Sequence, residues 1–193
     1  MVFDMVSFIL FLRRSVGLIF TPYKTMRKIS TESTWPELIW IFILVILYFF
    51  ITNSVHFWIN GLIGACGLFL ASIIFFSFLP AAGAYTERLK RILVTWSYTL
   101  FPTLIWFYST LLFYVFIPPP RTTSLLGKSF SIFYLAFSIS LLVWKFILVY
   151  LSIRFSLRIN LYRIIYYMSL YLALSIPLWI FLYNIGISRI PFV

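Results

Sequence analysis

The side chains that can do acid–base, nucleophilic or metal chemistry are few in this chain of 193 residues. The carboxylates, the histidine and the cysteine are Asp4, Glu32, Glu37, Glu87, His56 and Cys66. Catalysis needs a set of such groups within reach of one another, and the sequence shows no such set. One histidine and one cysteine do not supply the three or four ligands of a zinc site, and a single cysteine forms no intrachain disulfide. The sequence therefore predicts a protein that is not an enzyme and uses no metal or cofactor.

The composition explains this shortage. Hydrophobic residues make up 63% of the chain and charged residues 10%, and the mean hydropathy is +1.06. A soluble domain of this length keeps about a third of its surface exposed, so it has too little interior for so many apolar side chains. We therefore expect an all-α integral membrane protein with a single membrane domain over residues 1–193.

Five segments are apolar enough to cross a hydrocarbon core of about 30 Å, which takes about 20 helical residues. In the third, Pro102 and a length of 26 residues indicate a kinked or tilted helix. The second carries small residues at roughly helical spacing, which permit close helix packing. The five predicted spans are residues 36–52, 57–79, 92–117, 130–153 and 164–182. The predicted helix-packing residues are Gly61, Gly64, Ala65 and Gly67.

Residues 1–35 precede the first predicted span and form a cytoplasmic segment. Asp4, Ser7 and Arg14 share one narrow polar stripe on a helical wheel, and apolar residues fill the rest. This pattern is typical of an amphipathic helix that lies in the membrane interface. A signal peptide is excluded because the charges follow the apolar stretch instead of preceding it. A tilted membrane segment and a helix packed on a partner protein remain as alternatives.

The distribution of the 15 lysines and arginines predicts the topology. Eleven lie in the N-terminal segment and in the connections that follow the second and fourth spans. Three lie on the opposite side, namely Arg121, Lys128 and Arg189, and Lys145 lies inside the fourth span. Positive residues favour the cytoplasmic side, so we expect a multi-pass protein with a cytoplasmic N-terminus and an external C-terminus.

The cytoplasmic cations lie in short runs between apolar segments, where lipid phosphates are nearer partners than nucleic acid. Residues 85–96 are amphipathic as well, so the third span is predicted to begin as an interfacial helix. The intramembrane Lys145 is expected to snorkel towards headgroups, to pair with Glu37 or to contact a lipid phosphate. An ordinary positive-inside signal remains the alternative for the basic runs. The candidate lipid- or partner-binding residues are Arg13, Arg14, Arg27, Lys28, Arg88, Lys90, Arg91 and Lys145.

Short motifs carry a resemblance to a known family. The N-terminal motif consists of Pro22, Met26, Arg27, Ile29 and Trp35, and a second consists of Ala81, Ala82, Gly83 and the run 88–91, followed by Tyr98 and Pro102. These elements resemble prokaryotic members of the Ypt-interacting-protein (Yip) family of five-span membrane proteins. The Asp-Leu-x-Gly-Pro element and the long N-terminal region of eukaryotic members are absent, so the resemblance does not extend to binding of Rab-type GTPases. It implies a non-enzymatic protein of membrane organisation or trafficking.

Two classes of function follow. The first is a non-catalytic scaffold or accessory subunit in membrane organisation or trafficking, which contacts anionic lipids and a protein partner or a second copy. Its contact surface is predicted on the small residues of the second span and on Arg88, Lys90 and Arg91. The alternative is the membrane subunit of a lipid or solute transport complex, to which Pro102 and Pro177 point. A short echo, PELIW at 36–40 and PTLIW at 102–106, makes a duplicated unit conceivable.

Overall fold

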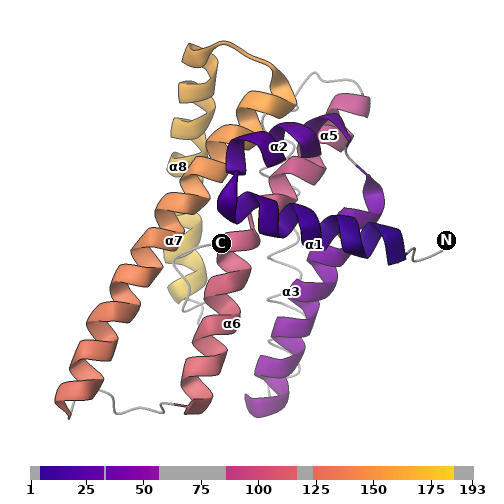
Figure 1. Ribbon diagram of the computed structural model, residues 1–193. Coiled ribbons are helices and arrows are strands. Elements are labelled where there is room, and N and C mark those ends of the chain that lie inside the picture. The colour runs from indigo at the N-terminus through magenta and orange to yellow at the C-terminus, as the bar shows by residue number, and fades with distance from the viewer. Residues whose placement is uncertain (1–4, 33, 57–85, 117–123, 185–193) are drawn as a thin grey trace.

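The computed structural model describes residues 5–32, 34–56, 86–116 and 124–184 (Figure 1). These residues are almost entirely helical and contain no strand. The helices are α1 (Met5–Phe20), α2 (Pro22–Thr31), α3 (Trp35–His56), α5 (Thr86–Tyr98), α6 (Phe101–Phe116), α7 (Leu125–Leu157) and α8 (Leu161–Asn184). The all-α prediction is confirmed for the described residues.

Local signals in the sequence explain several helix ends. Pro22 opens α2, where its missing N–H costs nothing. The side chain of Ser124 caps α7 by accepting a hydrogen bond of 3.0 Å from the backbone N–H of Gly127. The other end of α7 stops at Arg158, whose φ of 52° is left-handed and turns the chain towards α8. These signals set the lengths of the elements that carry the basic residues.

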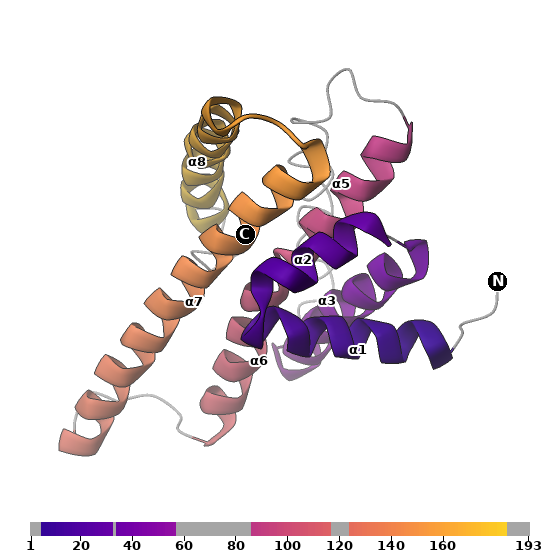
Figure 2. The ribbon, with the colours of Figure 1, turned by 45° about the horizontal axis from the view of Figure 1, so that its top comes forward.

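The helices form an upright group with two helices lying across one end. In Figure 1, α3, α6, α7 and α8 run roughly up and down the molecule, and α1 and α2 cross in front of them near the top. Figure 2 shows α1 and α2 beside each other on this face. Helix α2 packs against α1, α5 and α7, and α8 packs against α7. The core lies where these helices meet, with Leu18, Met26, Ile92 and Leu148 fully buried.

A close contact joins α1 to α2. A Cβ atom at Gly17 would lie 2.7 Å from Oγ1 of Thr25, which is too short for a real contact. The backbone N–H of Thr21 donates to the carbonyl of Gly17 at 2.8 Å and closes the turn. Any larger residue at position 17 would therefore require the Thr25 side chain to move, so the small size of Gly17 permits the close approach of α1 and α2.

One of the described helices, α7, is long and apolar enough to cross a membrane, and Trp35–Leu47 in α3 is a shorter apolar stretch. Helix α7 contains the predicted span 130–153. The predicted spans 36–52 and 164–182 lie within α3 and α8, and their crossing of a membrane stays a prediction. The predicted span 57–79, with Gly61, Gly64, Ala65 and Gly67, lies outside the described residues.

The third predicted span, 92–117, is not one kinked helix. It consists of α5 and α6, which are separated at Thr99 and Leu100. The backbone N–H of Thr99 donates to Trp96 at 2.9 Å, and that of Leu100 donates to Ser97 at 3.1 Å, so the last turn of α5 tightens. Pro102 has no N–H to continue the α-helical ladder and opens α6 instead.

The apolar stripe of residues 85–96 faces protein in the part that the structure describes, and the interfacial position of this segment stays a prediction. Ile92, Val94 and Trp96 are buried inside the molecule. Helix α5 packs against α2, α3 and α7, so the apolar stripe read from its sequence faces protein. An amphipathic pattern indicates that one face is apolar, and it does not distinguish lipid from a protein core.

Candidate functional site

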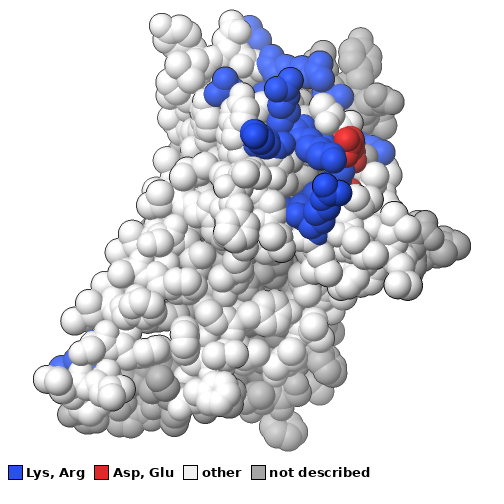
Figure 3. Space-filling model, viewed as in Figure 1, with Lys and Arg blue, Asp and Glu red and all other residues white. Residues whose placement is uncertain are grey.

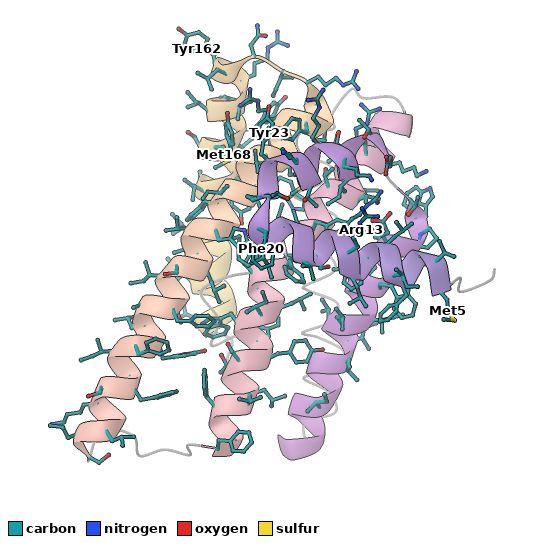
Figure 4. The ribbon with its side chains drawn as sticks, in the orientation of Figure 1. Met5, Arg13, Phe20, Tyr23, Tyr162 and Met168 are labelled. Atoms are coloured by element: carbon teal, nitrogen blue, oxygen red, sulfur yellow. The ribbon has the colours of Figure 1, made fainter. Side chains whose placement is uncertain are left out.

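The polar stripe of α1 faces into the protein. Ser7, Arg14 and Ser15 are buried, whereas most large apolar side chains of this helix are exposed. Figure 4 shows Met5 and Phe20 at the two ends of α1 and Arg13 between them. The predicted N-terminal amphipathic helix is therefore present, and its polar face is turned away from the outer surface. Its position in a membrane interface stays a prediction.

A fully buried carboxylate accepts hydrogen bonds from this stripe. Glu37 in the first turn of α3 is 0% exposed, and it accepts from Nη1 of Arg14 and from Oγ1 of Thr34. Its other oxygen accepts from the hydroxyl of Tyr98 at 2.6 Å. We call Arg14, Thr34, Glu37 and Tyr98 the Glu37 cluster. It joins α1, α3 and α5 at the end of the molecule that α1 and α2 cover.

Charges in the Glu37 cluster compensate one another. Burial by itself lowers the pKa of the Arg14 guanidinium, but the hydrogen bond and negative charge of Glu37 outweigh this and hold the pKa above its ordinary value. Nη2 of Arg14 also bonds Oε2 of the half-exposed Glu32 at 3.0 Å. The N-terminal position of Glu37 in α3 favours its negative charge through the helix dipole. Arg14 was predicted to contact lipid or a partner, and this prediction is wrong because carboxylates inside the protein hold its guanidinium.

Lys145 lies in a second buried polar contact. Its side chain is 3% exposed, and Nζ donates to Oγ1 of Thr103 at 3.0 Å. The predicted snorkelling to headgroups is therefore wrong, and Glu37 pairs with Arg14 instead of Lys145. Thr103 follows Pro102 in the first turn of α6, next to the break between α5 and α6.

The two contacts occupy equivalent places in the echoed sequence. Glu37 in PELIW and Thr103 in PTLIW are each the residue after a proline at the start of a helix. Each accepts a hydrogen bond from a basic side chain of another helix. Helices α3 and α6 also pack together, and the hydroxyl of Tyr108 donates to the carbonyl of Leu44 at 2.7 Å. The echo therefore marks two helix starts, each of which provides a buried acceptor for a basic side chain of another helix.

Basic side chains gather on the end of the molecule that α2 covers, where Figure 3 shows most of the blue surface. Nine described lysines and arginines lie there, seven exposed and two half-exposed. We call this set the basic surface. Its members are Arg13, Lys24, Arg27, Lys28, Lys90, Arg91, Arg154, Arg158 and Arg163.

The basic surface agrees in part with the predicted binding residues. Arg13, Arg27, Lys28, Lys90 and Arg91 belong to it, and the side chain of Arg88 lies outside the described part of the chain. The predicted set lacked four cations that the fold adds, although the charge count had already placed them on the same side. These four residues are Lys24, Arg154, Arg158 and Arg163.

Contacts between α2 and the end of α7 hold the basic surface together. Oγ of Ser30 donates to the carbonyl of Phe155 at 3.0 Å, and the rings of Tyr23 and Phe155 lie 5.0 Å apart (Figure 4 labels Tyr23). The guanidinium of Arg154 lies 5.9 Å from the ring centroid of Tyr23. Cations that are distant in the sequence are therefore held on one face.

Among the described residues, no three histidine, cysteine or carboxylate side chains lie close enough together to hold a metal ion. The arrangement consists of one neutralised buried cluster, one buried lysine contact and one basic surface. Its evident chemical capacity is the binding of anions at the surface.

No family model matches the chain, and neither a curated protein nor a solved structure matches it significantly. The resemblance to the Yip family stays a prediction. Met26 and Ile29 of the quoted motif are fully buried where α2 meets the core, so packing alone accounts for these two positions.

Proposed function

We propose that this chain is a five-span membrane protein that acts as a non-catalytic scaffold or accessory subunit in membrane organisation or trafficking. In this proposal the N-terminus is cytoplasmic, and the basic surface binds the anionic headgroups of the cytoplasmic leaflet. The observation that carries the proposal is the gathering of nine described cations around the end of α7, the helix that is long and apolar enough to cross a membrane. A protein partner or a second copy would then contact the remaining helix surfaces.

The length of α7 supports this placement. A helix of 33 residues is about 50 Å long, whereas the hydrocarbon core is about 30 Å thick. Its ends therefore reach the headgroup layers, and Arg154 and Arg158 lie at one of them. Each lysine or arginine near an anionic membrane surface contributes about 1 kcal/mol of attraction. The basic surface is thus suited to lipid phosphates.

The first prediction concerns lipid binding. The variant Lys24→Gln/Arg27→Gln/Lys28→Gln should bind phosphatidylglycerol in detergent micelles at least about tenfold more weakly than the wild type, since each cation contributes about 1 kcal/mol. Binding by the wild type should fall as salt rises, because the attraction is screened. The measurement is a titration followed by tryptophan fluorescence.

The charge-matched control is Arg121→Gln/Lys128→Gln/Arg189→Gln, which removes the cations predicted on the opposite side. It should bind this lipid as the wild type does. Equal loss of binding in both triple variants would show that total charge matters and the basic surface does not, and it would refute the proposal.

The second prediction concerns topology. In a Cys66→Ala background, a cysteine at position 90 should react with an impermeant thiol reagent only from the cytoplasmic side. Cysteines at positions 56 and 125 should react only from the outside, as the partition of basic residues requires. Reaction of positions 90 and 56 from one side would contradict the five-span arrangement.

The second candidate function is a membrane subunit of a lipid or solute transport complex. The observation that favours it is the break between α5 and α6 beside the buried Lys145–Thr103 contact. Discontinuous helices with polar groups at the break line the sites of many transporters. Movement of a fluorescent phospholipid or solute by the purified protein in proteoliposomes, abolished by Lys145→Met, would favour this candidate over the scaffold.

A further inference from the structure

Helix α1 presents a continuous apolar face to its surroundings. Eight large apolar side chains between its ends are 38–80% exposed, whereas the polar Ser7, Arg14 and Ser15 are buried. Arg13 is the one exposed charged residue of Met5–Phe20. The exposed apolar residues are Met5, Val6, Phe8, Ile9, Leu12, Val16, Ile19 and Phe20. The exposed face of α1 is therefore suited to an apolar medium, and its single charge contributes little electrostatic attraction to an anionic membrane.

The fold holds α1 at one depth relative to α7. Helix α1 packs on α2, with the backbone N–H of Thr21 donating to the carbonyl of Gly17 at the turn between them, and the hydrogen bond from Ser30 to Phe155 holds α2 near the basic end of α7. On the other side, Arg14 binds Glu37 in the first turn of α3. Helix α1 therefore lies across the upright helices at the basic end of the molecule, as both ribbon views show (Figures 1 and 2).

Lipid is the occupant that fits this face. The basic surface borders α1 and is complementary to anionic headgroups, and α7 leaves the hydrocarbon core at the same end. The apolar face also continues onto α3, where the rings of Phe8 and Trp40 lie 4.7 Å apart and Ile46 and Leu47 are exposed. A helix in the interface buries its apolar face about 5–10 Å into the boundary between headgroups and acyl chains.

We propose that α1 is a wedge in one leaflet, through which the protein prefers membranes that are convex on its basic side. A helix that lies in one leaflet takes up area there and none in the other leaflet. Convex curvature spreads the headgroups of the outer leaflet and opens apolar gaps, which favours insertion of an apolar helix face. Since α1 has a single exposed charge, its insertion depends on these gaps more than on anionic lipid. The inference rests on the proposed placement of the basic end at the membrane surface.

The test uses the full-length protein in giant vesicles from which membrane tubes are pulled. In a Cys66→Ala background, a fluorophore that cannot cross the membrane is attached to Asn160→Cys, which lies between α7 and α8 at the basic end. It marks only molecules whose basic end faces outward. The wild type should be enriched on the tube over the flat membrane by on the order of twofold or more, because such insertion is sensitive to curvature. Absence of enrichment would overturn the wedge.

The decisive variant is Ile9→Ser/Leu12→Ser/Val16→Ser, whose three side chains are about half exposed. It should lose the enrichment. The matched control Ile132→Ser/Ile139→Ser/Val143→Ser changes similarly exposed residues of α7 and should keep it. Loss in the α7 control with retention in the α1 variant would overturn the proposal.

Two further measurements separate the wedge from the lipid-binding proposal and from misfolding. The Lys24→Gln/Arg27→Gln/Lys28→Gln variant should keep its enrichment on tubes while its affinity for anionic lipid falls, so each proposal can fail without the other. A spin label on Val16→Cys should be reached by oxygen more readily than by a water-soluble nickel complex, as in the acyl region. A label at position 16 that faces water, or one covered by a second copy of the chain, would refute insertion.

Discussion

Replacing Arg14 by methionine is expected to lower the free energy of unfolding by about 3–5 kcal/mol, because the substitution leaves the buried charge of Glu37 without its cation. Thr34 and Tyr98 still donate to the carboxylate, but neutral donors do not compensate a full buried charge. Glu37→Gln should cost less, since Arg14 keeps its contact with the half-exposed Glu32. Unfolding by SDS in mixed micelles, followed by tryptophan fluorescence, measures each change.

The neighbouring Arg13→Met is the matched control and should change stability by less than about 0.5 kcal/mol, because Arg13 is exposed. The double variant Arg14→Met/Glu37→Gln should recover much of the loss, since it removes both charges and keeps an acceptor for Tyr98. A coupling energy of about 1–3 kcal/mol between positions 14 and 37 is expected. Strict additivity of the two single changes would show that the Glu37 cluster does not hold α1 to the bundle.

Replacing Thr103 by valine is expected to cost about 1–3 kcal/mol, because it removes a hydroxyl that accepts from the buried Nζ of Lys145. Thr103→Ser keeps the hydroxyl and should cost much less. In a Lys145→Met background the difference between threonine and valine should shrink, since methionine needs no acceptor. The same unfolding measurement is made on the four proteins of this double-mutant cycle, namely the wild type, Thr103→Val, Lys145→Met and the double variant.

If Thr103→Val lowers the free energy of unfolding equally in the wild-type and Lys145→Met backgrounds, the hydroxyl stabilises α6 without any contribution from its contact with Lys145. The cycle also bears on function, because Lys145 lies beneath the surface. Lys145→Met should leave phosphatidylglycerol binding by the basic surface unchanged. A large loss of that binding would show that the basic surface and the α5–α6 break act as one site.

Much of the secondary structure could be predicted from the sequence, because it depends on local signals. Long apolar runs predicted α3, α7 and α8, and the amphipathic N-terminus predicted α1, whereas the start of α6 at Pro102 had been predicted as a kink inside one span. The grouping of most cations at one end was also predictable, because the connections between apolar segments alternate between the two ends of a bundle. These properties depend on the order of residues along the chain and on no particular neighbour.

Tertiary structure decided which side of each amphipathic helix meets protein. The helical wheel of α1 shows a polar stripe with Arg14. In an apolar medium such a stripe can face the protein interior when a buried polar group there pairs with it. That partner, Glu37, is 23 residues away along the chain, and Tyr98 is a further 61 residues on. In α5 it is the apolar stripe that faces inward, because α2, α3 and α7 pack against it.

Sequence by itself therefore determined that the chain is apolar and helical, and which segments carry the cations. Only the packed fold decided that Arg14 and Lys145 are structural rather than lipid-facing, that the third apolar segment breaks before Pro102, and that α1 turns its apolar face outward. The physical reason is that propensity and periodicity are local, whereas the cost of burying a charge depends on which distant side chains the fold brings to it.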